Sequence, residues 1–287
     1  MLSSLARALP TVVEPFSVSV GPITVTGFGL AVLFGFLIGQ HIGQAELARR
    51  GHDPAPVADV VVASVIGFLV GAKVYYAVLM HDWSTLLTRG GFVFWGGLIG
   101  GVGAAWVTIR RKRIPFARIA DVGAIGIAAG YAVGRTGCWA VGDDYGRPWD
   151  SPFAVAFPHG APPSTAGSMQ SMFGVAIPAG MGPDTLRGVY PTQLLEVALG
   201  FAMFAVLWRL RDHRHREGWL FGVYMVLAGL ERFVVEFFRA KDDRLLGPIT
   251  VAQAIALAFV LLGFVVVRQF ARPAAATAAT LSVPPER

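Results

Sequence analysis

The chain changes from apolar to polar over residues 134–147, which read Gly134-Arg135-Thr136-Gly137-Cys138-Trp139-Ala140-Val141-Gly142-Asp143-Asp144-Tyr145-Gly146-Arg147. This stretch ends a long apolar run and brings an arginine, two adjacent carboxylates, a thiol and four glycines into a short length of chain. An arginine at the end of a membrane segment is costly to leave unpaired, so it either reaches the headgroup region or meets an anion held there.

The composition is typical of a membrane protein. Of the 287 residues, 54% are hydrophobic and 15% are charged, and the mean hydropathy is +0.58. The single cysteine excludes an intramolecular disulfide, and no spacing of cysteine and histidine resembles a metal site, so we expect no metal and no cofactor. The formal net charge of +6 comes from basic clusters between apolar runs, which argues against a nucleic-acid partner.

Seven apolar runs are each close to the roughly 20 residues that cross a bilayer core. They cover about 22–42, 57–79, 92–109, 117–137, 191–208, 219–238 and 249–267. The first twenty residues lack a continuous apolar core and do not resemble a cleaved signal peptide. We therefore predict an all-α, polytopic membrane protein of about seven transmembrane helices, forming one domain over residues 1–272.

The charges between the runs predict the orientation. Basic clusters follow the first, third, fifth and seventh runs, which places the amino terminus outside and the carboxy terminus in the cytoplasm. The longest loop, at about 140–190, then lies at the outer face, and its short apolar piece at 172–178 could lie along the membrane surface. The Ala-, Pro- and Thr-rich tail, 273–287, is expected to be disordered in the cytoplasm.

Ionisable residues inside the apolar runs are expensive and are therefore candidates for function. They are Lys73, Asp121, Arg135, Glu196, Glu231, Arg232 and Glu236, with Arg239 at the end of the sixth run. The last three, Arg232, Glu236 and Arg239, are four and then three residues apart and would share one helix face. They form either a structural Arg-Glu pair or a site in which a carboxylate orients an arginine toward a lipid phosphate.

Other candidates also have a structural alternative. Gly96 and Gly97, with two more glycines four residues later, could pack helices closely as readily as contact a substrate. Lys73 could extend to the headgroups. Asp121 is better explained as a cap or interfacial residue than as a catalytic one. Gln193 lies three residues before Glu196, so both could join the same polar cluster.

Several blocks, in order, resemble the prolipoprotein diacylglyceryl transferase family of bacterial integral membrane enzymes, which have about seven helices. The blocks are Gly21-Pro22-Ile23; Gly71-Ala72-Lys73 with Tyr75-Tyr76; Phe94-Trp95-Gly96-Gly97-Leu98-Ile99-Gly100; Gly134-Arg135-Thr136-Gly137; Tyr190-Pro191-Thr192-Gln193-Leu194-Leu195-Glu196; and Arg232-Phe233-Val234-Val235-Glu236-Phe237-Phe238-Arg239. The resemblance spans most of the chain, and the blocks are specific together rather than singly.

The resemblance implies a multi-pass enzyme of the bacterial cytoplasmic (inner) membrane that acts in lipoprotein biosynthesis. Family members move the diacylglyceryl group of phosphatidylglycerol to the lipobox cysteine of a prolipoprotein, which forms a thioether and releases glycerol phosphate. The partners would be that phospholipid and the signal-peptide region of the acceptor. The implied catalytic residues are Arg135, Arg232, Glu236 and Asp143, and the implied substrate-binding residues are Arg239, Glu196, Gln193, Lys73, Gly96, Gly97, Gly134 and Gly137.

The chain departs from the family pattern at positions that handle protons. Trp95 and Tyr190 stand where the family has histidines, Cys138 and Val141 where it has asparagines, Asp143 where glutamate is usual, and Phe28 where it has a tyrosine. Two explanations stay open. Asp143 or Asp144 handles the proton in a divergent transferase, or the protein is a paralogue that acts on a related lipid with another acceptor.

Two further classes of function are weighed against the enzyme. A transporter or flippase would also need charges within the membrane, but the two halves show no convincing repeat and no pair of interrupted helices. A non-catalytic lipid-binding protein would keep the fold without the reaction. A covalent intermediate on Cys138 is disfavoured, because a buried thiol in a membrane helix is more often an inert packing residue.

Overall fold

Seven long helices dominate the structure, a computed structural model that describes residues 11–21, 23–88, 91–240, 244–246 and 249–271. They are α1 (Gly27–Arg49), α2 (Ala55–Met80), α3 (Phe94–Arg111), α4 (Phe116–Val141), α6 (Thr192–Leu210), α7 (Trp219–Val235) and α8 (Val251–Phe270). Each predicted apolar run coincides with one of these helices. The predicted tail, 273–287, lies outside the described residues.

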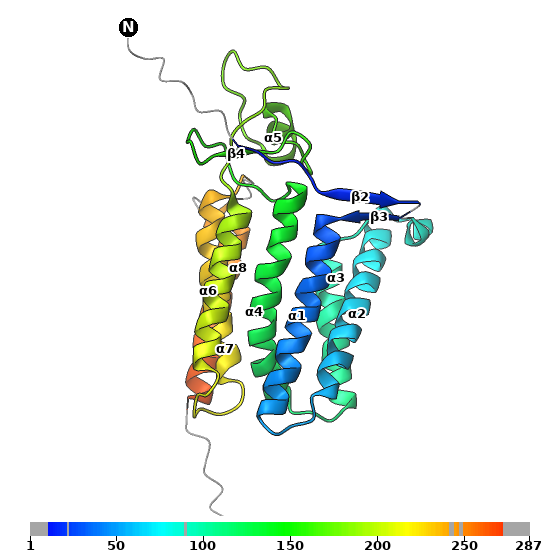
Figure 1. Ribbon diagram of the computed structural model, residues 1–287, viewed down its shortest axis with the longest axis vertical. Helices are drawn as coiled ribbons and strands as arrows, with labels where there is room; N and C mark the ends of the chain where they lie inside the picture. Colours follow the sequence, from blue (N-terminus) through cyan, green and yellow to red (C-terminus); the bar gives the residue numbers. More distant parts are fainter. Residues whose placement is uncertain (1–10, 22, 89–90, 241–243, 247–248, 272–287) are drawn as a thin grey trace, which may run out of the picture.

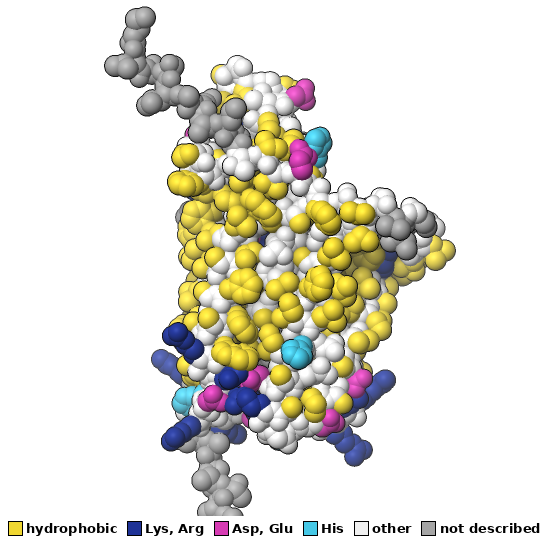
Figure 2. All heavy atoms as spheres, in the orientation of Figure 1, with side chains coloured by type: hydrophobic (Ala, Val, Ile, Leu, Met, Phe, Trp, Pro, Cys, Tyr) yellow, Lys and Arg dark blue, Asp and Glu magenta, His cyan; other side chains and the backbone are white. Residues whose placement is uncertain are grey.

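Five of the helices are long and apolar enough to cross a membrane: α1, α2, α4, α6 and α8. The chain is therefore a mostly helical, polytopic membrane protein. Large apolar side chains point outward along these helices, as with Leu261 at 67% exposed and Ile66 at 57%. Figure 2 shows the same pattern as a broad hydrophobic surface over the middle of the bundle, with most of the charged side chains at one end. Such a surface is suited to lipid rather than water.

Local sequence signals set several helix ends. The side chain of Thr26 accepts a hydrogen bond from the backbone N–H of Gly29 and caps α1. Thr250 and Gln253 form a reciprocal capping box at the start of α8. Helix α4 begins after Pro115 and ends at Gly142, whose φ of 65° is in the left-handed region that glycine adopts most easily. This last ending turns the chain directly into the Asp143-Asp144 pair.

Glycines allow the helices to approach closely in pairs. A Cβ added at Gly100 of α3 would lie 2.2 Å from the backbone oxygen of Gly67 in α2, and one added at Gly35 of α1 would lie 2.7 Å from that of Gly130 in α4. Helices α7 and α8 meet in the same way at Gly263. In Figure 1 these pairs are arranged side by side, with α1 and α4 between the α2–α3 pair and the group of α6, α7 and α8.

The short elements are β1 (Thr11–Val12), β2 (Ser17–Val20), β3 (Ile23–Thr26), β4 (Val155–Ala156), α5 (Ala166–Phe173), β5 (Arg244–Leu246), β6 (Ile249–Thr250) and the 3₁₀ turns η1 (Trp83–Leu87) and η2 (Glu236–Phe238). Strands β2 and β3 form an antiparallel hairpin, β5 and β6 form another, and β1 runs parallel to β4. The first hairpin, β4 and α5 lie at one end of the bundle in Figure 1.

The long loop between α4 and α6 has a core of its own. Tyr145, Val155, Phe157, Met169 and Val189 form a buried cluster. Tyr145 and Phe157 stack with ring centroids 5.6 Å apart. The apolar piece predicted at 172–178 begins in the last turn of α5 and continues without helix. The loop therefore forms a packed cap over one end of the bundle, immediately beside the start of α6.

Candidate active site

Arg135 lies in the last two turns of α4 and connects three parts of the structure. Its side chain is only 12% exposed. Nη1 donates to Sγ of Cys138 at 3.1 Å and to Oδ2 of Asp144 at 2.9 Å, while Nη2 donates to Glu196 on α6. One guanidinium therefore holds α4, the following loop and α6 together.

A second arginine shares Asp144. Nη2 of Arg239 donates to Oδ1 of Asp144 at 2.8 Å, and the Arg239 side chain is 16% exposed. Burial alone would raise the pKa of Asp144, but the charges and hydrogen bonds of Arg239 and Arg135 lower it to about 2. Asp144 is therefore ionised at any physiological pH and bridges two cations.

The start of α6 positions the two aspartates by their backbone. Nε2 of Gln193 donates to the backbone oxygen of Asp143 at 2.6 Å, and Oγ1 of Thr192 donates to that of Asp144 at 2.8 Å. Gly146 is equally constrained, since a Cβ there would lie 2.4 Å from the backbone oxygen of Phe238. The predicted residue Gln193 thus lies in the site, where its side chain holds the loop that carries Asp143 and Asp144.

The Arg232–Glu236 pair is present as the sequence predicts, with Nη2 of Arg232 2.7 Å from Oε2 of Glu236. Arg239 does not stay on the same face. Helix α7 ends at Val235, η2 follows, and the backbone at Arg239 is extended. This change of direction explains why Arg239 turns to Asp144 instead of continuing the predicted row.

A tyrosine links Arg135 to α7. The hydroxyl of Tyr131 lies 2.9 Å from Oε1 of Glu231 and 3.3 Å from Oε1 of Glu196, the carboxylate that binds Arg135. Sequence reasoning missed Tyr131, although its position four residues before Arg135 places both on one face of α4. Among the described residues, no hydrogen bond or ion pair joins Arg135 and Arg232 to a common residue. A joint catalytic role for these two arginines stays a prediction.

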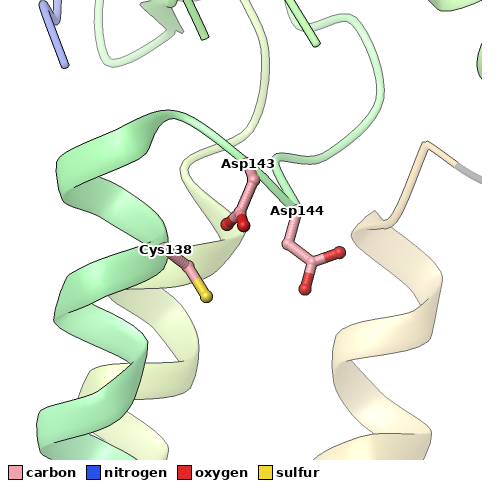
Figure 3. A group of neighbouring side chains, drawn as sticks. All are labelled: Cys138, Asp143 and Asp144. Carbon is pink, nitrogen blue, oxygen red and sulfur yellow. The ribbon is translucent and has the colours of Figure 1, made fainter. Parts of the chain in front are cut away.

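Cys138, Asp143 and Asp144 form a compact group of possible metal ligands. One donor atom from each lies within 4.8 Å of the others. Figure 3 shows the Cys138 sulfur on α4 and the Asp143 carboxylate above it on the loop, with Asp144 beside them. However, Nη1 of Arg135 already donates to Cys138 and Asp144, so a metal ion would compete with a buried cation for the same atoms. The arrangement fits a guanidinium better than a metal.

The environment of Asp143 differs from that of Asp144. Burial raises the pKa of Asp143, and the charge of Asp144 adds to the rise, while a hydrogen bond with Cys138 and the nearby arginines oppose it. Its Oδ1 is buried and has no hydrogen-bond partner among the described residues. The two adjacent carboxylates therefore have pKa values shifted in opposite directions, a pattern that often separates catalytic roles.

The other predicted site residues either pack between helices or lie away from the arginine cluster. Gly96 and Gly97 face α2, where added Cβ atoms would lie 2.2 Å from Cβ of Tyr75 and 2.6 Å from the Phe68 ring. Gly137 packs on α1, whereas a Cβ at Gly134 would meet nothing within 4 Å. Lys73 donates to the backbone oxygens of Thr85 and Thr88 near η1. A substrate-binding role for these residues stays a prediction.

An apolar hollow of about 400 Å³ lies beside the Asp144 loop. Its walls include Trp149, Tyr190, Leu195 and Phe238, and the Trp149 and Tyr190 rings stack with centroids 4.3 Å apart. Thr192, which holds Asp144, also lines it. Apolar space therefore adjoins the arginine and aspartate cluster, as a site for an amphipathic molecule requires.

The family model for prolipoprotein diacylglyceryl transferase matches residues 15–268. The chain belongs to this family. It is 31% identical over 242 residues to the phosphatidylglycerol–prolipoprotein diacylglyceryl transferase of Chromohalobacter salexigens, with 81% of this chain and 82% of the relative covered. The proteins of the same name from Nitratidesulfovibrio vulgaris strain DP4 and Rhodospirillum rubrum are 29% and 30% identical, covering 89% and 90% of this chain and 94% and 93% of theirs.

The prolipoprotein diacylglyceryl transferase resemblance also locates the departures. Tyr190, where the sequence resemblance predicts a family histidine, is stacked on Trp149, and both rings line the apolar hollow. Trp95 is 52% exposed on α3 and packs edge-on against Phe94. Cys138 and Asp143, by contrast, lie within the arginine cluster itself. The departures expected from the sequence therefore lie both in the arginine cluster and along the apolar hollow.

Proposed function

We propose that this protein transfers the diacylglyceryl group of phosphatidylglycerol to the thiol of a lipobox cysteine. The acceptor thiol loses its proton, its sulfur bonds to the terminal glyceryl carbon, and the bond from that carbon to the phosphate oxygen breaks. Glycerol phosphate leaves with that oxygen and its electron pair. The observation that carries the proposal is the buried Arg135–Asp144–Arg239 cluster beside an apolar hollow, in a chain of this family.

The phosphate is bound by arginine N–H groups that the carboxylates leave open. Each arginine has five donors. Arg239 uses Nη2 for Asp144, and Arg232 uses Nη2 for Glu236 and is 35% exposed, so both retain donors for a phosphate. Arg135 fixes the position of Asp144, and its charge stabilises the negative charge that develops on the leaving phosphate. Glu236 orients Arg232, and Glu196 orients Arg135.

Asp143 is the base that removes the thiol proton. Of the two aspartates left open by the sequence, Asp144 is bound to two arginines and has its pKa lowered to about 2, so it is a weak base. The pKa of Asp143 is raised, and its Oδ1 has no partner among the described residues. A carboxylate with a raised pKa is the better proton acceptor.

We infer that the chain crosses the bacterial cytoplasmic membrane seven times, with the amino terminus outside and the carboxy terminus in the cytoplasm. The site would then lie at the outer face of that membrane. Support comes from the loop charges and from the charged end of the bundle opposite the α5 cap (Figure 2). In intact cells, a membrane-impermeant thiol reagent is expected to label Asp150→Cys and not Arg214→Cys. The reverse labelling pattern would contradict this orientation.

The activity is tested with purified protein, labelled phosphatidylglycerol and a synthetic lipobox peptide. We expect a gain of one diacylglyceryl mass on the peptide cysteine, and no gain on a matched peptide with serine in its place. Release of glycerol phosphate without a lipidated peptide would indicate another acceptor, which the substituted histidine positions would explain. Binding of the lipid with no product would indicate a non-catalytic protein.

A further inference from the structure

A second hollow, which is lined by polar side chains, lies at the end of the bundle opposite the candidate active site. It has a volume of about 300 Å³ and is lined in part by Arg50, which follows the last residue of α1, by Asp121 from α4 and by His213 from the turn between α6 and α7. Asp121 precedes Arg135 by fourteen residues, which is about 20 Å along α4 at 1.5 Å per residue. The hollow is therefore separate from the transfer site.

The buried carboxylates around this hollow are already occupied. Glu46, whose side chain is 2% exposed, binds Arg49 at 2.8 Å and Arg211 at 3.1 Å. Asp121 accepts hydrogen bonds from the backbone N–H groups of Gly218 and Phe221, both at 2.9 Å, and so caps the start of α7. Both acids are therefore bound to groups other than Arg50.

The remaining donors are Arg50 and His213. The guanidinium of Arg50 comes no closer than 4.0 Å to Glu46 and to Asp121, and its buried Nη2 has no hydrogen-bond partner among the described residues. The His213 side chain is 8% exposed, and neither ring nitrogen has a partner there; its closest carboxylate oxygen, on Asp121, is 3.7 Å away. Buried polar groups are normally satisfied, so an unpartnered pair facing one hollow indicates a missing ligand.

The chemistry of the donors selects an anion. A planar guanidinium binds two phosphate oxygens at once, and an imidazole N–H can donate to a third. Arg49 and Arg211 also line the hollow, but both pair with Glu46, and the lining acid Glu217 pairs with Arg118. These paired charges offset one another, so the unpartnered donors of Arg50 and His213 decide the ligand. The volume exceeds that of a bare phosphate and leaves room for a substituent. Trp208, which lies 3.8 Å from the Arg211 guanidinium, is typical of a membrane interface.

We propose that this hollow binds a phosphate group through Arg50 and His213. The phosphate belongs either to the headgroup of an anionic lipid at this membrane face or to a soluble phosphate. The site is independent of the transfer reaction, and its occupation would join α1, α4 and the α6–α7 turn at the end of the bundle away from the acceptor.

The two sources are separated by two probes. Inorganic phosphate is titrated into the full-length protein in zwitterionic detergent, with binding measured by calorimetry and the shift in Tm. Separately, the protein in nanodiscs of phosphatidylcholine, with and without phosphatidic acid, is analysed for retained phosphatidic acid by native mass spectrometry. The variants are Arg50→Gln and His213→Gln. Arg214→Gln is the matched control, because Arg214 is an exposed cation of the same turn outside the hollow.

We expect each hollow variant to weaken binding of one probe by at least about tenfold, the effect of losing one hydrogen bond to a charged group, with Arg214→Gln unchanged. If the hollow variants bind inorganic phosphate more weakly than the control in the titration, the ligand is soluble phosphate. If they lose only the phosphatidic acid retained in nanodiscs, the ligand is a lipid headgroup. Arg50→Lys keeps the charge and tests the two-oxygen contact if Arg50→Gln does not fold. The proposal is wrong if neither probe binds, or if the hollow variants bind both as the control does.

Discussion

Replacement of Arg135 by lysine is expected to lower kcat for diacylglyceryl transfer by about 100-fold or more, the usual cost of losing a positioned donor to a developing oxyanion. The guanidinium contacts Cys138, Asp144 and Glu196 at once. A lysine ammonium is a single point charge and cannot span all three groups. The measurement is the initial rate of label transfer to the lipobox peptide, with the fold checked by circular dichroism.

Alanine is a poor choice at position 135 because it leaves the buried Glu196 carboxylate without its ion-pair partner. The Glu196 side chain is 4% exposed, and removing one partner of a buried ion pair typically costs about 3–5 kcal/mol. Loss of activity in Arg135→Ala would then mix unfolding with chemistry. The double variant Arg135→Gln/Glu196→Gln removes both charges together, and Glu196→Gln alone is its control. If the double variant transfers label within about threefold of Glu196→Gln, Arg135 does not stabilise the transition state.

The helices and one half of the site follow from local sequence. Apolar runs of bilayer length predict all seven helices, and the four-residue spacing from Arg232 to Glu236 predicts their ion pair. The close approach of α2 and α3 follows from the paired glycines near Gly96. These features depend only on helical periodicity and on side-chain size, which a sequence shows directly.

The partner of Arg135 depends on geometry that local sequence does not show. Arg239 meets Asp144 because α7 ends at Val235 and the chain changes direction over η2. Asp144 reaches both arginines because Gly142 ends α4 with a positive φ and Thr192 holds the next turn. The contacts of Asp144 with Arg239 and Thr192 join residues 95 and 48 positions apart. The end of α7 at Val235 also falls inside the apolar run that the sequence predicts to continue to residue 238. Sequence reasoning therefore identified the arginines and not their pairing.

Replacement of Asp143 by asparagine is expected to lower kcat by about 10²–10⁴-fold, the range for loss of a general base. The base acts in its ionised form, so the rate of the unmodified enzyme falls as the pH drops through the pKa of Asp143. Because burial raises that pKa, this acidic limb lies at higher pH than for an ordinary aspartate. The limb should disappear in Asp143→Asn, leaving a low rate that does not vary with pH in that range.

The adjacent carboxylate supplies the matched control. Asp144→Asn also lowers the rate, because it frees Arg135 and Arg239 from their shared anchor. It should nevertheless keep the acidic limb and move it to lower pH, since the charge of Asp144 raises the pKa of Asp143. A loss of the limb in Asp144→Asn, with the limb intact in Asp143→Asn, would assign the proton to the other aspartate. An amide at either position keeps the size of the side chain, so the presence or absence of the acidic limb, rather than the size of the rate loss, shows which carboxylate titrates.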